Sequence, residues 1–271
     1  MNPYKTNSER QLLTVNHLAE MKRQGEKIAC LTAYDASFSA LLDEAGIDII
    51  LVGDSLGMVI QGNSSTVPVT LDDMVYHSRC VTRRRRRAFV ISDMPFMSYS
   101  TVEQALQSAA RLMQQGGAQM VKLEGAHVDI IRCLVAQGIP VCGHLGLLPQ
   151  SINQLGRYKV QGTVPDRAEQ MIQDALAIEK AGASLLVLEC VPATLAQTIS
   201  RRLEIPVIGI GAGPACDGQV LVLYDILNID SGRKPKFFKD FMTGSESVLA
   251  AVKTYRQAVK KQTYPAPEHC Y

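Results

Sequence analysis

The feature that most constrains the fold is a series of eight short apolar runs, rich in β-branched residues, separated by segments with helical periodicity. The runs are mostly continuous rather than alternating in polarity, which is typical of strands buried on both faces of a parallel sheet. We expect strands at residues 28–32, 48–52, 88–92, 120–123, 140–143, 185–188, 206–210 and 219–223.

A recurring glycine turn sets the size of the repeating unit. Gly46, Gly117 and Gly182 each follow a helical segment, and they lie 71 and 65 residues apart. Each interval contains two apolar runs, so that one strand–helix unit takes about 34 residues and eight units nearly fill the 271 residues. The sequence therefore predicts one α/β domain, a (β/α)8 TIM barrel, over residues 1–271. The alternative is a doubly wound open sheet, although no G-x-G-x-x-G motif follows the first run.

The two ends of the chain lie outside this repeat. Residues 8–25 have the pattern of an extra N-terminal helix that closes the bottom of the barrel. The last helix is expected at Val248 to Lys260. The segment 262–271, which contains Pro265 and Pro267, is predicted to be a flexible tail.

Composition excludes several classes of partner. Lys plus Arg is 28 and Asp plus Glu is 26, and this near balance argues against a dedicated nucleic-acid or anionic-membrane binder. The apolar runs are too short to span a bilayer, and the polar N-terminal segment predicts no signal peptide. Seven cysteines without a C-x-x-C pair are expected to be mainly buried apolar residues in a reducing cytosol.

Acidic residues follow directly after several of the apolar runs. Asp35, Asp54, Asp93 and Glu124 would lie at the C-terminal ends of the strands, where barrel enzymes build their active sites. Three of them, Asp54, Asp93 and Glu124, could present carboxylates to one spot, a donor set that favours Mg²⁺ first and Mn²⁺ next. The alternative is that each carboxylate caps the following helix or turn.

Other strand ends carry candidate catalytic groups. Lys122 and Glu124 are two residues apart on a strand and face the same way, so they would pair with each other or bind a ligand. Glu189 ends an apolar run, where burial raises the pKa of a carboxyl group and suits a general base; the alternative is an inert buried residue. His144 is interpreted as a hydrogen-bonded core residue. The glycine-rich turn at residues 209–213 fits either a ligand or tight packing.

These residues and their neighbours resemble the ketopantoate hydroxymethyltransferase family. The similarity spans roughly residues 28 to 240, and no single motif has to carry it. The matching stretches are residues 31–35, 52–58, 66–70, 93–97, 121–125, 140–146, 156–162, 188–192, 208–213 and 217–222.

The resemblance implies a barrel of the phosphoenolpyruvate/pyruvate type that uses Mg²⁺. It implies Asp54 and Asp93 as metal ligands, with Glu124 in the same metal site directly or through water. It implies Glu189 as the proton acceptor. The family's keto-acid contacts match Asp54, Ser55, Asp93 and Lys122.

The resemblance also implies a reaction and an assembly. A hydroxymethyl group would pass from 5,10-methylenetetrahydrofolate to 3-methyl-2-oxobutanoate, through a Mg-stabilised enolate, to give 2-dehydropantoate for pantothenate and coenzyme A. The partners would be the small-molecule keto acid and folate, and the enzyme would be a cytoplasmic homodecamer. One alternative is a Mg-dependent carbon–carbon lyase on the same barrel, but residues 141–144 lack the lysines of a Lys-Lys-Cys-Gly-His stretch.

Two departures from the family pattern stand out. Asn63 and Ser64 occupy positions where the family usually has His or Tyr and then an acidic residue, which puts folate-side or loop contacts in doubt. The five arginines from Arg83 to Arg87 exceed what the family predicts. They are interpreted as a solvated or subunit-contact segment at a helix end, with a non-catalytic anion-binding or nucleic-acid-binding barrel as the alternative.

Overall fold

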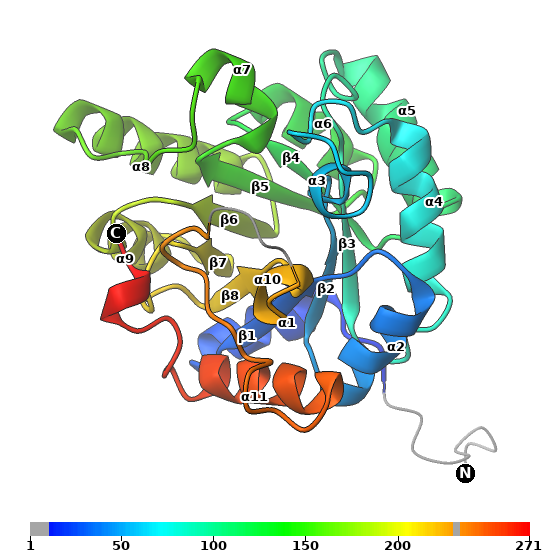
Figure 1. Cartoon of the computed structure of the whole chain (residues 1–271). Helices are drawn as coiled ribbons and strands as arrows, with labels where there is room; N and C mark the ends of the chain where they lie inside the picture. The colour runs from blue at the N-terminus through cyan, green and yellow to red at the C-terminus, as the bar shows by residue number, and fades with distance from the viewer. Residues whose placement is uncertain (1–10, 230–233) are drawn as a thin grey trace, which may run out of the picture.

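The computed structural model describes residues 11–229 and 234–271. Eight parallel strands form a closed barrel in which each strand pairs with the next and the eighth pairs with the first (Figure 1). The predicted α/β barrel is therefore confirmed, and the open sheet is excluded. The strands are β1 Ile28–Thr32, β2 Ile49–Val52, β3 Phe89–Asp93, β4 Met120–Glu124, β5 Val141–Gly146, β6 Leu185–Glu189, β7 Val207–Ile210 and β8 Gly218–Leu221.

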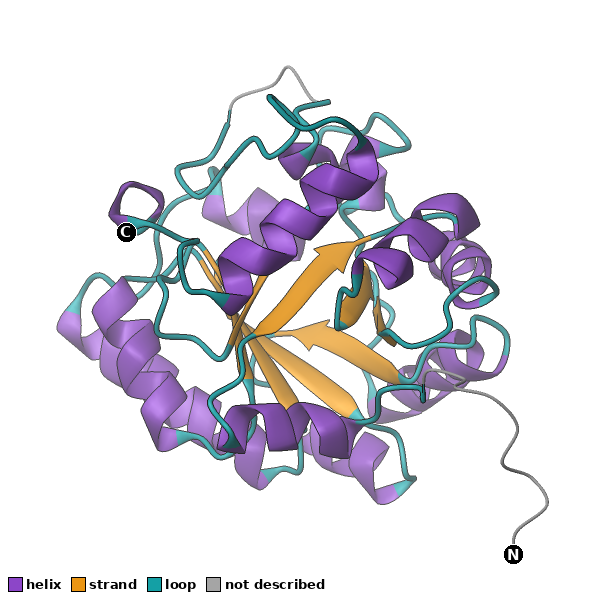
Figure 2. Cartoon of the chain, turned by 90° about the horizontal axis from the view of Figure 1, so that it is seen from below, coloured by secondary structure: helices purple, strands orange, loops and turns teal. Residues whose placement is uncertain are grey.

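The helices surround the strands when the barrel is seen from below (Figure 2). The helices are α1 Val15–Arg23, α2 Ala36–Ala45, α3 Leu56–Val59, α4 Leu71–Thr82, α5 Val102–Gln114, α6 Val128–Ala136, α7 Ile152–Leu155, α8 Pro165–Lys180, α9 Ala193–Arg202, α10 Leu223–Ile226 and α11 Val248–Lys260, and the 3₁₀ turns are η1 Pro149–Ser151 and η2 Pro267–His269. The last helix has the predicted bounds. Within the described ranges, no helix combines the length and the apolar character needed to cross a bilayer.

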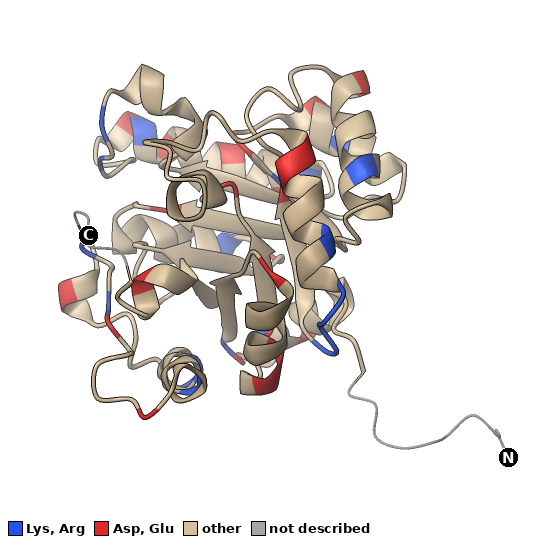
Figure 3. Ribbon diagram, turned by 45° about the vertical axis from the view of Figure 1, so that its right-hand side comes forward, with Lys and Arg blue, Asp and Glu red and all other residues tan. Residues whose placement is uncertain are grey.

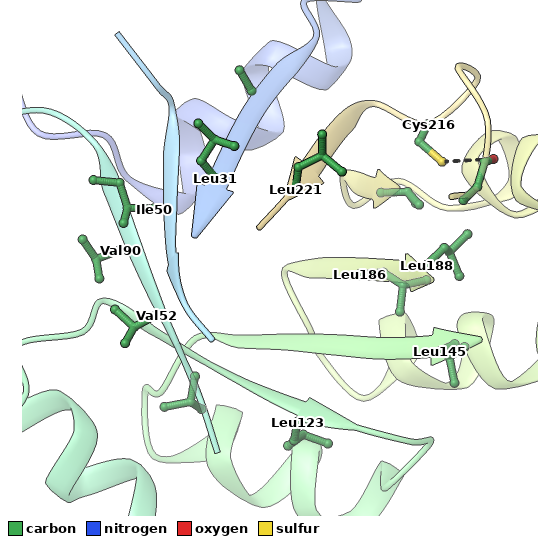
Figure 4. Packing of buried hydrophobic residues seen from close by; sticks show 14 of the residues in the cluster. Leu31, Ile50, Val52, Val90, Leu123, Leu145, Leu186, Leu188, Cys216 and Leu221 are labelled. Carbon is green, nitrogen blue, oxygen red and sulfur yellow. Dashed lines mark hydrogen bonds between the residues drawn. The ribbon is translucent and has the colours of Figure 1, made fainter. Parts of the chain in front are cut away.

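Alternate residues of each strand serve two separate cores. Outward-facing side chains such as Leu31, Ile50 and Val90 pack between the strands and the helices (Figure 4). Inward-facing side chains such as Phe89 and Ile91 fill the barrel interior. Burial on both faces explains the continuous apolar runs, and it places every second residue of a strand inside the barrel.

Helix α1 closes the bottom of the barrel, as predicted, but it is shorter than predicted. Its Leu18 and Met21 join the interior core. Residues 8–10 of the predicted helix lie outside the described residues, and residues 11–14 are not helical. The helix begins after Thr14, an N-cap whose extended backbone N–H donates to Nδ1 of His17 at 3.1 Å.

The connection between β7 and β8 differs from the other units of the repeat. Residues 211–217 form a turn without a helix and return directly to the start of β8. The connection has to run the length of one strand, from the end of β7 back to the start of β8. Seven residues are enough because each strand has only four residues and an extended chain covers about 3.3 Å per residue. The average of about 34 residues per unit therefore hides one short unit.

Residues 262–271, which were predicted to be a flexible tail, pack against the barrel in this structure. Tyr264 is buried, and its hydroxyl donates to the carbonyl oxygen of Phe237 at 2.6 Å. His269 is also buried, and the Tyr271 carbonyl accepts a hydrogen bond from Ala193 N–H at 3.0 Å. The two prolines suggested loose chain, but the aromatic side chains before and after them supply apolar area that anchors the segment.

The distribution of charged residues and the burial of cysteines agree with what the composition predicts. Acidic and basic residues are interspersed over the outer helices in the view of Figure 3. All seven cysteines, which lie in the described ranges, are free, and Cys30, Cys142, Cys190 and Cys216 are buried. The prediction of mainly buried apolar cysteines is therefore confirmed for these four.

Candidate active site

Asp54 and Ser55 lie just beyond the end of β2. The Asp54 carboxyl is buried, and its backbone N–H donates to Oδ2 of Asp93 at 3.0 Å. The Ser55 hydroxyl lies 2.8 Å from the Tyr34 hydroxyl. Gly53 makes this turn possible, since a Cβ there would lie 2.8 Å from Ser55 Oγ and 3.5 Å from Asp93 Oδ2. The turn after β2 thus places Asp54 and Ser55, two of the predicted substrate-binding residues, beside Asp93, which is a third.

Asp93 and Lys122 are neighbours across two strands. They are register partners in β3 and β4, and both continue the inward-facing positions of their strands. Lys122 Nζ lies 2.5 Å from Asp93 Oδ1, and both side chains are almost fully buried. The predicted partner of Lys122 was Glu124 or a ligand, and the structure shows Asp93 instead.

Glu124, His144 and Glu189 form the other half of the site. Glu124 and His144 are register partners in β4 and β5, and His144 lies on the inward face. Its Nδ1 lies 3.7 Å from Glu124 Oε1, and its Nε2 lies 3.3 Å from Glu189 Oε2. Neither ring nitrogen has a hydrogen-bond partner among residues 11–229 and 234–271, which does not agree with the prediction of a hydrogen-bonded core histidine. A buried imidazole between two carboxyl groups belongs to the site.

Burial first, and then the surplus of carboxyl groups over buried cations, controls the protonation of these groups. Burial, and then repulsion from Asp93, raises the pKa of Asp54 to about 7. Burial, with Asp54 adding to it, raises the pKa of Glu124 well above its usual range. Burial alone would lower the pKa of Lys122, but the carboxylates of Asp93, Glu124 and Asp54 raise it overall. The lysine therefore stays charged, while the acidic groups share an excess of negative charge.

Glu189 and His144 are tuned in the direction of proton transfer. Burial raises the pKa of Glu189 to about 8, although Lys122 opposes that effect. Burial, and then the positive charge of Lys122, lowers the pKa of His144 well below its usual range. A neutral imidazole thus lies beside a carboxyl group whose pKa is near neutrality, which is the range that suits a general base.

The three predicted metal-binding carboxylates are not grouped around one point. Among the described residues, no three His, Cys, Asp or Glu side chains are arranged as ligands of one metal ion. Asp54 and Asp93 are adjacent, whereas Glu124 Oε2 accepts a hydrogen bond from Gln150 N–H at 3.0 Å. A pair of carboxylates with a net negative surrounding still fits Mg²⁺, because that ion usually takes one or two carboxylates and completes its shell with water and substrate oxygens.

Other predicted candidates have structural roles. Asp35 caps α2, since its Oδ1 accepts hydrogen bonds from the backbone N–H groups of Ser37 and Phe38. The glycine turn after β7 is tightly packed, and a Cβ at Gly211 would lie 2.6 Å from the ring of Phe237. The simple packing and capping alternatives therefore account for both features.

The contacts of Arg87 and of Asn63 are with residues outside this cluster. Arg83 ends α4, and Arg87 forms an ion pair with buried Asp48 at 3.0 Å. The Asn63 side chain donates to Gln61 Oε1 at 3.1 Å, and its backbone N–H donates to the carbonyl of Gly57. The Asn63 contacts are thus local to the loop that follows α3.

Two residues of the site escaped sequence analysis. The Gln150 side chain is buried, donates to Asp54 Oδ2 at 2.8 Å and accepts from the Tyr99 hydroxyl at 2.6 Å. A search for ionisable groups at strand ends passes over both of them. The available signal was position alone, because Gln150 lies in the loop after β5, at the face where barrel loops carry function.

Comparison with known proteins places this site in a family. The sequence profile of ketopantoate hydroxymethyltransferase matches residues 12–267. The 3-methyl-2-oxobutanoate hydroxymethyltransferase of Alkalilimnicola ehrlichii is 56% identical over 264 residues, covering 97% of this chain and 95% of that protein. The protein of the same name from Methylococcus capsulatus is 57% identical over 261 residues, covering 96% and 97%.

Solved structures agree at the level of the fold. Phosphonopyruvate hydrolase with oxalate and Mg²⁺ has a TM-score of 0.59 at 11% identity, covering 78% of this chain and 81% of that one. A 2,3-dimethylmalate lyase of the PEP mutase/isocitrate lyase superfamily has a TM-score of 0.56 at 15% identity, covering 78% and 81%. These structures share the barrel fold with this chain, and the chain belongs to the ketopantoate hydroxymethyltransferase family of enzymes.

Proposed function

We propose that this enzyme transfers a hydroxymethyl group from 5,10-methylenetetrahydrofolate to 3-methyl-2-oxobutanoate and forms 2-dehydropantoate for pantothenate and coenzyme A. The observation that carries the proposal is the cluster of three buried carboxyl groups, those of Asp54, Asp93 and Glu124, around buried Lys122, with the half-buried Glu189 at the same face of the barrel. Relatives with 3-methyl-2-oxobutanoate in their names match nearly the whole chain and support the choice of substrate.

Asp54 and Asp93 would hold Mg²⁺ in this site, with Glu124 contributing directly or through water. The fit rests on the unbalanced negative charge described above and on the all-oxygen donor set. When bound, the ion supplies a Lewis acid that polarises the keto acid and acidifies its C3–H bond. Lys122 orients the substrate carboxylate through its buried ammonium group, and Ser55 donates a further hydrogen bond to the substrate.

Glu189 removes the proton from C3 of the keto acid. Its burial keeps the carboxyl group a strong enough base to accept that proton near neutral pH. The electron pair left at C3 forms the new carbon–carbon bond to the one-carbon unit, tetrahydrofolate leaves, and one water molecule provides the hydroxyl group. His144, held neutral by its burial, lies 3.3 Å from Glu189 Oε2 and adds no positive charge that would lower the basicity of that carboxyl group.

The proposal includes the assembly and the location that the resemblance implies, a homodecamer in the cytoplasm. Only the family resemblance supports them. Sedimentation analysis tests the assembly, because a decamer has ten times the 29.6 kDa mass of one chain.

Proton NMR in D₂O tests the reaction. The purified protein with Mg²⁺ is expected to exchange the C3 proton of 3-methyl-2-oxobutanoate and, after methylenetetrahydrofolate is added, to produce new hydroxymethyl signals. EDTA and Glu189→Gln are expected to abolish both signals. Exchange without product would show that the keto-acid part of the proposal holds and the folate part is wrong. The absence of both signals in a folded, Mg²⁺-loaded sample would overturn the proposal.

A further inference from the structure

Gln150 connects the loop after β5 to two carboxyl groups of the site. It lies in η1, its side chain is buried, and it donates hydrogen bonds through both its backbone and its amide group. The backbone N–H donates to Glu124 Oε2 at 3.0 Å, and the side-chain Nε2 donates to Asp54 Oδ2 at 2.8 Å. One residue therefore holds one oxygen of each carboxyl group, and these groups come from different strands.

The orientation of the Gln150 amide is fixed by its surroundings. Nε2 also faces the carbonyl oxygen of Met94 at 3.0 Å. A carbonyl oxygen can only accept a hydrogen bond, so the amide NH₂ group must lie on this side. The amide oxygen then accepts from the Tyr99 hydroxyl at 2.6 Å, and that hydroxyl accepts from Glu124 N–H at 3.4 Å. Both ends of the amide are therefore satisfied, and it cannot flip without losing the hydrogen bonds to Asp54 and Met94.

The hydrogen bonds from Gln150 occupy only one oxygen of each carboxyl group. Asp54 Oδ1 and Glu124 Oε1 have no protein hydrogen bond in the described part of the chain. Gln150 and Glu124 also line a cavity of about 230 Å³, together with Phe96, Tyr99 and His127. The Gln150 amide thus holds the Asp54 carboxyl group, while Gln150 itself and Glu124 line a cavity that a ligand can enter.

We propose that Gln150 is a positioning residue that fixes the carboxyl groups of Asp54 and Glu124 for divalent cation binding. The inference rests on the metal site of the proposed function. A hydrogen-bonded outer residue of this kind typically changes metal affinity by about 10- to 100-fold when it is removed. The same loss is expected here, since Asp54 would lose the donor that restrains its rotation.

Mn²⁺ binding to the substrate-free protein tests this inference without relying on catalysis. Electron paramagnetic resonance of free Mn²⁺ gives the dissociation constant of wild type, Gln150→Met and the matched control Gln119→Met. Gln119 also makes two amide hydrogen bonds, to Val90 N–H and Leu13 O, but at the other end of the barrel. Methionine keeps the length of glutamine and removes its side-chain hydrogen bonds, while the backbone N–H that donates to Glu124 stays.

The expected result is a Kd about 10- to 100-fold higher for Gln150→Met, with Gln119→Met within about twofold of wild type. Equal constants for Gln150→Met and Gln119→Met would overturn the inference while leaving the proposed function intact. Absence of Mn²⁺ binding in the folded wild type would instead remove the metal from the proposed function, and this inference with it.

Tyr99→Phe provides a second variant that keeps the core filled. It removes the hydroxyl that donates to Gln150 Oε1, so its Kd for Mn²⁺ is expected to rise by a smaller factor than that of Gln150→Met. Tyr99→Phe combined with Gln150→Met should have little further effect on the Kd, because the amide that the Tyr99 hydroxyl contacts is already absent. If Gln150→Met does not fold, an unchanged Kd in Tyr99→Phe overturns the inference.

Discussion

Replacing Glu189 by glutamine should stop proton removal and, at the same time, stabilise the substrate-free protein at alkaline pH. The carboxyl group is buried at the end of β6, and burial raises its pKa from 4.5 to about 8. Below pH 4.5 it is neutral in the folded and the unfolded chain. Between pH 4.5 and about 8 the unfolded chain ionises at this residue while the folded chain keeps its proton, so the wild type loses stability progressively across this window and has the full penalty above about pH 8. Glutamine avoids that cost.

The size of the effect follows from the pKa difference. The change from 4.5 to about 8 corresponds to about 5 kcal/mol, at about 1.36 kcal/mol per pH unit. This is an upper bound, because 16% of the side chain is exposed and water screens the charge. We expect a gain of about 1–3 kcal/mol at pH 9 relative to pH 5, which raises the Tm by roughly 2–4 °C per kcal/mol in a chain of this size.

Calorimetry of chelator-treated protein between pH 5 and pH 9 measures this difference. Glu103→Gln is the matched control, because Glu103 is an exposed glutamate at the start of α5. The Tm difference between Glu189→Gln and wild type should grow with pH, while that of Glu103→Gln stays constant. A pH-independent difference for Glu189→Gln would show that Glu189 ionises without penalty, and the argument for a tuned general base would fail.

Three further changes test other parts of the structure. Lys122→Met leaves the Asp93 carboxyl group buried without its cation and should lower the free energy of unfolding by about 3–5 kcal/mol in chemical denaturation; a loss under about 1 kcal/mol would contradict the pairing. Gly53→Ala places a Cβ against Ser55 Oγ and should lower kcat/KM about 10²-fold, whereas unchanged kinetics would show that the turn can yield. Tyr264→Ala should destabilise the protein by about 3–5 kcal/mol and expose the C-terminal segment to limited proteolysis; resistance equal to wild type would refute the anchoring role of Tyr264.

The barrel could be predicted because burial on both faces leaves a strong signal in sequence. All eight strands lie within a few residues of the predicted runs, and the predicted ends of β3, β4 and β6 stop just short of Asp93, Glu124 and Glu189. Each of these side chains continues the inward positions of its strand. Because side chains alternate along a strand, a local sequence pattern indicates which residues face the barrel interior. Asp93, Lys122 and Glu124 all lie at such inward positions.

What could not be predicted depends on contacts between distant segments. The pairing of Lys122 with Asp93 rather than Glu124 follows from the register of β3 with β4, which no local pattern specifies. Gln150 reaches Asp54 across 96 positions of sequence, through a loop whose own residues show no periodicity. The segment 262–271 reads as loose chain because its anchor, the Tyr264 contact with Phe237, is equally non-local.

Protons and a divalent cation relieve the same excess of negative charge, so they should compete for the site. Asp54, whose pKa is raised to about 7 by burial and by Asp93, is mostly protonated at pH 6 and mostly ionised at pH 8. A ligand carboxyl group must lose its proton before it binds the ion. The Kd for Mn²⁺ should therefore be about tenfold higher at pH 6 than at pH 8, as expected for one competing proton of that pKa. Paramagnetic resonance at both pH values measures it, and Asp54→Asn should bind weakly at either. An affinity that does not change with pH would mean that Asp54 is ionised throughout, and the charge imbalance could then not explain why this site favours a cation.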